Sequence, residues 1–151
     1  MELRPERPED AAFLAALFRS AAPALDGLPA SVAAALLAMQ VRSQAASYRA
    51  AYPAACFAVI ERGGEPIGRL VVAPGPVACV VDYALLPEVR GAGLGTAVLA
   101  AVLARIDGDV QCRVLAGNRA SLAMFRRLGF AVTGEEPPFW RLKWRAVTSA
   151  G

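Results

Sequence analysis

The chain has no histidine, and this absence limits the chemistry that its 151 residues can perform. Without imidazole there is no Ser-His-Asp or Cys-His catalytic site and no metal site with histidine ligands. Any acid–base step must therefore use Asp, Glu, Tyr, Lys, Cys or water. The absence excludes several of the commonest hydrolase and metalloenzyme designs.

Long apolar segments are lacking too. No run is free of polar residues for long enough to span a bilayer, and residues 1–10 alternate charges without an apolar signal core. We therefore expect a cytoplasmic protein with no membrane partner. The sequence has three cysteines, and they lie far apart in apolar, strand-like runs: Cys56, Cys79 and Cys112. We expect buried, reduced thiols rather than a disulfide or a metal site.

Concentrated charge is the third thing missing. The formal net charge is only +3, and the arginines are spread along the chain with modest clusters at 119–127 and 141–145. Nucleic-acid-binding domains usually gather such charge on one face or helix. The distribution favours a small anionic ligand over DNA or RNA.

What the sequence does contain is a hydrophobic content of 56%, enough for one packed domain of this length. Apolar periodicity and Pro/Gly breaks predict helices at 8–22, 30–51, 93–106 and 119–128. They predict strands at 2–4, 56–60, 67–73, 77–86, 110–115, 130–133 and 140–145. The order β-α-α-β-β-β-α-β-α-β-β indicates one α+β domain over residues 1–146, followed by a frayed tail at 147–151. Its central sheet should be mixed, mostly antiparallel and flanked by helices.

Two packing predictions follow from the helical patterns. In the 30–51 helix, Val32, Leu36, Met39 and Val41 should pack against the domain, opposite a more polar stripe. The 93–106 helix is apolar nearly all round, so it should be covered on more than one side.

The most informative stretch is 80–104, where an apolar strand passes through glycines 91, 93 and 95 into an Ala/Leu/Val helix. A strand that leads through a glycine-rich turn to a helix N-terminus forms an anion site, because backbone N–H groups converge there. We predict that this turn holds the diphosphate of a nucleotide-bearing cofactor. The alternative is a tight strand-to-helix connection without a ligand.

Two familiar nucleotide-binding motifs do not fit this turn. A dinucleotide fingerprint needs G-x-G-x-x-G in a parallel βαβ unit, whereas the spacing here is G-x-G-x-G after hairpins. A P-loop needs G-K-[ST], and this turn ends in G-T with no lysine.

A third pattern fits. Arg90-Gly91-Ala92-Gly93-Leu94-Gly95 resembles the R/Q-x-x-G-x-G/A signature of the GNAT superfamily of acetyl-CoA-dependent N-acyltransferases. Downstream, N-R-A-S-L-A-M-F-R-R-L-G-F (118–130) resembles the second marker of that family, N-x-x-A-x-x-x-Y-x-x-x-G-F. The predicted element order matches the family fold over nearly the whole chain.

The resemblance implies acetyl-CoA as co-substrate, no metal, and a small-molecule or peptide amine as acceptor. It implies that the turn residues hold the diphosphate, that the pantetheine arm pairs along the strand end, and that the start of the second marker flanks it. The cofactor-binding residues would be Leu85, Leu86, Arg90, Gly91, Ala92, Gly93, Leu94, Gly95, Thr96, Asn118 and Phe125. Arg119, Arg126 and Arg127 could approach the ribose phosphate. A homodimer is left open.

The catalytic residues are less clearly marked. The family often protonates the leaving thiolate with a tyrosine in the second marker, and here that position is Phe125. Tyr83 is a candidate replacement, as are Tyr48 and Tyr52. Asp82, the only charged residue in its strand, could be the general base, and its alternative role is a hydrogen-bonded structural aspartate.

The sequence thus predicts direct acetyl transfer from acetyl-CoA to a primary amine. A different class of function, a non-catalytic acyl-CoA binding or sensing domain, is compatible with the missing tyrosine. A purely structural module would leave the glycine turn unused.

Overall fold

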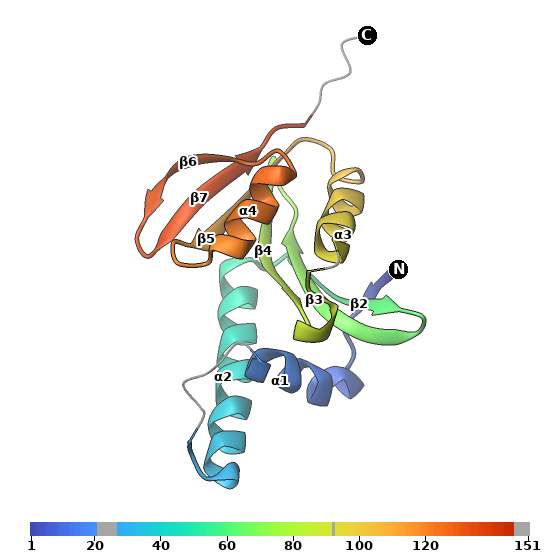
Figure 1. Cartoon of the computed structure of the whole chain (residues 1–151), viewed down its shortest axis with the longest axis vertical. Coiled ribbons are helices and arrows are strands. Elements are labelled where there is room, and N and C mark those ends of the chain that lie inside the picture. The colour runs from blue at the N-terminus through green and yellow to red at the C-terminus, as the bar shows by residue number, and fades with distance from the viewer. Residues whose placement is uncertain (21–26, 92, 147–151) are drawn as a thin grey trace. The chain divides into compact units, whose positions relative to one another are not determined.

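The computed structural model describes residues 1–20, 27–91 and 93–146, and Figure 1 shows their helices and strands. The elements follow the predicted order, with a short 3-10 turn added before α1 and another before α3. The strands are β1 (Glu2–Pro5), β2 (Cys56–Arg62), β3 (Glu65–Ala73), β4 (Val77–Leu85), β5 (Asp109–Leu115), β6 (Ala131–Glu136) and β7 (Phe139–Trp144). The helices are η1 (Pro8–Asp10), α1 (Ala11–Ser20), α2 (Ala30–Ala51), η3 (Pro87–Val89), α3 (Leu94–Leu103) and α4 (Arg119–Arg127).

In the described part of the chain, seven strands form one sheet in the order β1-β2-β3-β4-β5-β7-β6. β4 and β5 are parallel, whereas the β1–β2, β5–β7 and β6–β7 pairs are antiparallel. This mixed sheet confirms the predicted α+β class. The domain consists of two compact units. The first contains Met1–Val71 and Asp82–Val89, and the second contains Val72–Val81 and the described residues from Arg90 onward.

In the first unit, α1 and the strands β2 and β3 supply the buried apolar side chains. Leu14 and Leu17 lie one turn apart on α1 and are only 7% and 4% exposed, while Val59 and Ile60 of β2 are fully buried. Gly68 of β3 lies where two backbones approach closely, since a Cβ there would be 2.5 Å from the carbonyl oxygen of Ala84. Only glycine fits at this position.

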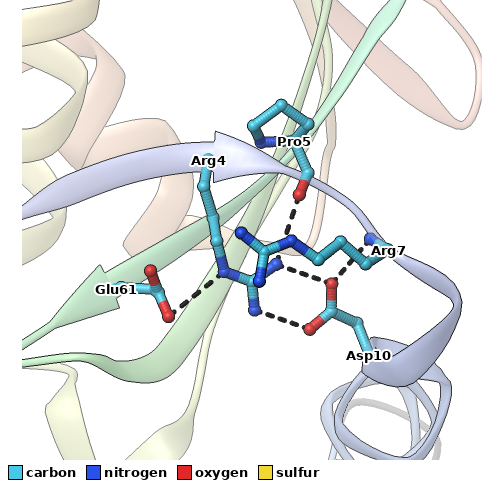
Figure 2. A network of polar contacts seen from close by, with 5 residues as sticks. All are labelled: Arg4, Pro5, Arg7, Asp10 and Glu61. Carbon is cyan, nitrogen blue, oxygen red and sulfur yellow. Dashed lines mark hydrogen bonds and ion pairs between the residues drawn. The ribbon is translucent and has the colours of Figure 1, made fainter.

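A network of charged side chains connects β1 to β2 and to η1, the turn just before α1 (Figure 2). Nη1 and Nη2 of Arg4 donate to the two carboxylate oxygens of Asp10 at 2.8 and 2.6 Å. The backbone N–H of Arg7 donates to the same carboxylate at 2.8 Å, and Nε of Arg4 lies 3.1 Å from Glu61 Oε2. The bonds that Asp10 accepts, above all the two from Arg4, lower the pKa of its carboxyl group to about 2.

This network predicts a pH-dependent contribution to stability. A carboxyl group whose folded-state pKa lies below its ordinary value of 3.8 stabilises the fold above that value. The contribution is lost as pH falls through about 2. We expect Asp10→Asn to lower the melting temperature at pH 7 by roughly 3–6 °C, because charged hydrogen bonds are replaced by weaker ones. The difference from the wild type should shrink below pH 4.

Glu9→Gln is the matched control for this prediction, since Glu9 is an exposed carboxylate in the same 3-10 turn. Thermal unfolding of the three proteins from pH 3 to pH 7 provides the measurement. Equal losses in the two variants, or a loss that does not change with pH, would contradict the assigned role of Asp10.

The second unit is built around β5, which pairs with β4 on one side and with β7 on the other. Val110, Cys112 and Val114 of β5 are buried and alternate with exposed residues, as expected for a strand with one covered face. The helices α3 and α4 contact each other (Figure 1).

Both packing predictions for the helices need correction. In α3 the buried residues are Val98, Leu99, Val102 and Leu103, whereas positions 97, 100, 101 and 104 are exposed alanines. One face of α3 is therefore covered, because alanine contributes apolar character without requiring burial. No residue of α2 is buried. Leu36 and Val41 are half-buried, whereas Val32 and Met39 are 44% and 54% exposed. The tail at 147–151 and the end of the first predicted helix, at 21 and 22, lie outside the described residues.

Candidate functional site

The glycine turn leads from η3 into the N-terminus of α3. Gly91 and Gly93 have left-handed backbones with φ of +83° and +75°, and Gly93 is the N-cap of α3. Because Gly93 has no side chain, the N-cap residue itself gives no side-chain hydrogen bond to the first turn. A Cβ placed on either glycine would meet no atom within 4 Å. The turn therefore combines a helix N-terminus with open space at Gly91 and Gly93, which suits an anionic group.

The predicted turn residues occupy the positions that the sequence assigned to them, within the described residues. Arg90 is exposed after η3, and Leu94, Gly95 and Thr96 form the first turn of α3 at intermediate exposure. Ala92 lies outside the described residues. Backbone N–H groups at the N-terminus of a helix can bind a phosphate without a lysine.

Asn118 caps α4, as its position in the sequence predicted. Its side-chain Oδ1 accepts a hydrogen bond from the Ser121 N–H at 3.2 Å. The three arginines of this helix are exposed: Arg119, Arg126 and Arg127. The start and the surface of α4 therefore present a capped N-terminus and three cations.

Phe125 points into the core of the second unit. It is 6% exposed, and its ring meets Phe130 edge to face, with centroids 5.1 Å apart. The position at which the resemblance places a tyrosine thus holds a buried ring with no hydroxyl. Its packing against Phe130 explains why an apolar ring is stable there.

The end of β4 carries Leu85 and, just beyond it, Leu86. The parallel register with β5 runs from Val77↔Asp109 to Val80↔Cys112. Leu85 is 7% exposed. The Leu86 N–H donates to Ile67 O at 2.9 Å, and Leu86 O accepts from Val89 N at 3.1 Å. Any further strand-like pairing with Leu86 must therefore use the second lone pair of its carbonyl.

Asp82 lies in a second polar region, within the first unit. We call this region the Arg69 cluster. Its members are Glu6, Gln44, Tyr48, Phe57, Arg69 and Asp82. Nη1 of Arg69 lies 3.7 Å from Asp82 Oδ2 and 3.4 Å from Gln44 Oε1, and Nε lies 3.5 Å from Glu6 Oε2. The guanidinium also lies over two aromatic rings, 5.9 Å from the centroid of Tyr48 and 5.4 Å from that of Phe57.

The environment of Asp82 raises the pKa of its carboxyl group above the ordinary value. Burial is the main cause, and it is opposed by the charge of Arg69 and by a hydrogen bond from the Tyr83 backbone. Burial likewise raises the pKa of the Tyr83 phenol, so this hydroxyl stays protonated at neutral pH. A carboxylate with raised proton affinity can act as a general base near neutral pH. The two side chains point to opposite faces of the strand, because successive residues alternate.

Arg69 is the residue that sequence reasoning missed. The signal was present, since Arg69 is a single charge inside the apolar run I-G-R-L-V-V-A (67–73). A charged residue in a strand is rarely buried without a partner, and such an isolated charge predicts one. The identity of the partners could not be read from the sequence, because Glu6 and Asp82 are distant from Arg69 along the chain.

The cysteines match the prediction only in part. Cys112 is buried and Cys79 is half-buried, but Cys56, the first residue of β2, is exposed. None of these three cysteines forms a disulfide in the described structure. Burial raises the pKa of Cys112 to about 12, which makes it a poor nucleophile. Among the described residues no group of His, Cys, Asp or Glu is arranged to hold a metal ion. No helix in the described ranges combines the length and the apolar character needed to cross a membrane.

Solved structures with the same fold are remote in sequence. The PaiA N-acetyltransferase from Thermoplasma acidophilum, solved in complex with coenzyme A, superposes with a TM-score of 0.73 at 13% identity, covering 96% of this chain and 98% of that one. An acetyltransferase from Thermus thermophilus gives a TM-score of 0.73 at 22% identity and 96% coverage of both chains. A GNAT acetyltransferase from Elizabethkingia anophelis with acetyl-CoA bound gives 0.59 at 13% identity, over 69% of this chain and 82% of that one.

Identities this low establish the fold and nothing finer. No curated protein sequence matches the chain. The sequence profile described as the Acetyltransferase (GNAT) family matches residues 31–130, which is well over half of the chain and includes both the glycine turn and α4. The chain therefore belongs to the GNAT family of acetyltransferases.

Proposed function

We propose that this protein transfers the acetyl group of acetyl-CoA to a primary amine of a small molecule or peptide. Family membership and the N-terminus of α3, with open space at Gly91 and Gly93, support the proposal. Acetyl-CoA supplies an activated thioester and carries phosphate groups that need cationic or N–H partners. The chain offers both kinds of partner.

For cofactor binding, we assign the diphosphate to the backbone of 90–96. The exposed arginines of α4 supply cations for the ribose phosphate, and Asn118 flanks the pantetheine arm. This arm pairs along Leu85 and Leu86 like an added strand. At Leu86 the pairing uses the carbonyl oxygen, since the N–H is already donated to Ile67.

For the chemistry, we assign Asp82 as the general base. It removes a proton from the acceptor ammonium, directly or through water, and the neutral nitrogen attacks the thioester carbonyl. As the C–N bond forms, the attacking nitrogen becomes cationic and gives its second proton to water. The C–S bond breaks, and the sulfur leaves as a thiolate that takes up a proton. Tyr83 is our candidate donor of that proton, since its phenol stays protonated. Because its side chain lies on the face of β4 opposite to Asp82, the proton reaches the sulfur through water. Phe125 cannot supply it.

The observation that carries the proposal is the glycine turn at the start of α3. The test is the release of coenzyme A from acetyl-CoA across a panel of amines, amino acids and peptide N-termini. Chromatography should quantify the product, because exposed Cys56 would also react with thiol reagents. We expect turnover with at least one primary amine. Binding of acetyl-CoA without turnover of any member would count against the enzyme.

A second function, non-catalytic acyl-CoA sensing, is favoured by one observation. Phe125 occupies the family's tyrosine position and is packed in the core against Phe130. A sensor would bind acetyl-CoA and leave it intact with every acceptor. The amine panel therefore decides between the two functions.

A further inference from the structure

Arg69 is the most deeply buried charged side chain of its cluster. The Arg69 side chain is 7% exposed, against 17% for Glu6 and 24% for Asp82. The carboxylates thus lie closer to solvent than the guanidinium that they share. Removing a cation from water is unfavourable unless its neighbours compensate for the lost hydration. Here two carboxylates, one amide and the faces of two aromatic rings do so.

The contacts of Arg69 are close enough for electrostatic attraction but too long for strong, charge-assisted hydrogen bonds. Its distances to Glu6, Gln44 and Asp82 are 3.4–3.7 Å. Nε of Arg69 and Oε2 of Glu6 are buried, and neither atom has a hydrogen-bond partner in the described structure. Well-formed charged hydrogen bonds are about 2.7–2.9 Å long. Arg69 therefore acts on its neighbours mainly through its charge.

The same chain offers a direct comparison in Asp10. Arg4 donates two hydrogen bonds of 2.6 and 2.8 Å to the carboxylate of Asp10, and these lower the pKa of Asp10 to about 2. Asp82, which faces its arginine at 3.7 Å across a buried environment, has a raised pKa instead. A bidentate pair would hold Asp82 permanently ionised and turned toward Arg69. The looser geometry leaves Asp82 able to take up a proton.

We propose that Arg69 is the positioning residue for Asp82, holding the carboxylate in place and balancing its charge without locking it in a bidentate pair. Glu6 competes for the same guanidinium, so two carboxylates share one cation. Gln44, Tyr48 and Phe57 keep the guanidinium itself in position. This inference rests on the proposed role of Asp82 as the base.

The other ionisable groups around the cluster must be considered before a pH experiment is read. Glu6 comes from the segment after β1, Tyr48 from α2 and Tyr83 from β4 itself. Arg49 of α2 stacks on the Phe57 ring at 4.5 Å. Phenols and guanidinium groups do not change charge between pH 4 and 8. Glu6, the second carboxylate that contacts Arg69 among the described residues, therefore needs a variant of its own in the experiment.

The test is the titration of the Asp82 carboxyl carbon by carbon-13 NMR, with Asp82→Asn to assign its signal. We expect Arg69→Met to raise the Asp82 midpoint by about one pH unit or more, because an opposing cation is lost. Arg69→Lys should keep the midpoint closer to that of the wild type. Arg49→Met is the matched control, since it removes an arginine that stacks on the same ring, and it should leave the midpoint unchanged.

Glu6→Gln gives an independent arm with a nearly isosteric change, which is needed if Arg69→Met does not fold. It should lower the Asp82 midpoint, because a like charge is removed and Arg69 is no longer shared. An Asp82 midpoint that is not lowered in Glu6→Gln, and that is not raised in any folded Arg69→Met protein, would overturn the proposal.

Kinetics then connects the titration to the proposed reaction. With an active acceptor, the acid limb of the kcat/KM profile should move with the NMR midpoint, while KM for acetyl-CoA stays unchanged. Full activity in Asp82→Asn would reject Asp82 as the base. It would also reject a role for Arg69 in the reaction. The NMR shifts would still report whether Arg69 controls Asp82, so the two failures are distinguishable.

Discussion

Replacing Gly93 with alanine is expected to abolish the stabilisation of this protein by acetyl-CoA. A ligand bound only by the native state at about 100 times its Kd raises the free energy of unfolding by about 2.7 kcal/mol. For a chain of 151 residues this corresponds to a rise in melting temperature of roughly 5–10 °C. We expect the wild type to show this rise at millimolar acetyl-CoA and Gly93→Ala to show little or none.

The physical reason lies in the backbone of the turn. Gly93 is the N-cap residue of α3 and has φ of +75°. This backbone conformation costs an L-residue about 1–2 kcal/mol. The added methyl group would also project into the open space in front of the helix N-terminus, where the diphosphate is proposed to lie. Strain should move the N–H groups out of alignment, and the methyl group should obstruct the ligand.

Gly64→Ala is the matched control, because strain alone would lower stability without affecting the ligand. Gly64 lies in the β2–β3 connection with φ of +82°, and a Cβ there also meets nothing within 4 Å. Both variants should melt a few degrees below the wild type without ligand. Only Gly64→Ala should recover the full shift with acetyl-CoA. An equal shift in both variants would show that the glycine turn is not the cofactor site.

The parts of the site that could be predicted from the sequence are those set by local chemistry. The glycine turn depends on residues that are adjacent in the chain, and its positive φ angles require glycine. The Asn118 cap depends on a side chain bonding a backbone group three residues on, and the structure confirms it. The bounds of α2 at Ala30–Ala51, between Pro29 and Pro53, follow from the two prolines in the same way.

What could not be predicted depends on contacts between distant segments. The apolar periodicity of α2 does not reveal that Val32 and Met39 stay exposed, since burial depends on what other elements cover. The run around Cys56 is apolar, yet the residue opens its strand and is exposed. Arg69 meets Glu6 and Asp82 only because the fold brings three segments together. The sequence indicated Asp82 as a candidate base, but it did not indicate Arg69 and Glu6, which influence its charge.

Asp82→Asn is expected to lower kcat/KM for an active amine acceptor by roughly 10²–10⁴-fold, the usual contribution of a general base. Asparagine keeps the size and polarity of the side chain but cannot accept the proton. The wild-type rate should rise with pH as Asp82 loses its proton, and this limb should be absent in the variant. Acetyl-CoA should still raise the melting temperature of Asp82→Asn, because no group of the glycine turn is changed.

Loss of fold would not explain such a result. Burial raises the pKa of Asp82, so its carboxyl group favours folding when protonated and loses that contribution as pH rises through the folded-state pKa. A neutral asparagine avoids this loss, but it also removes one of the two carboxylates that compensate the buried charge of Arg69. The retained rise in melting temperature with acetyl-CoA is therefore the check that the variant is folded. Asp107→Asn makes the same chemical change at an exposed position and should leave both rate and pH profile unchanged. If Asp82→Asn behaved like Asp107→Asn, Asp82 would be a structural aspartate, and the base would have to be water or another carboxylate.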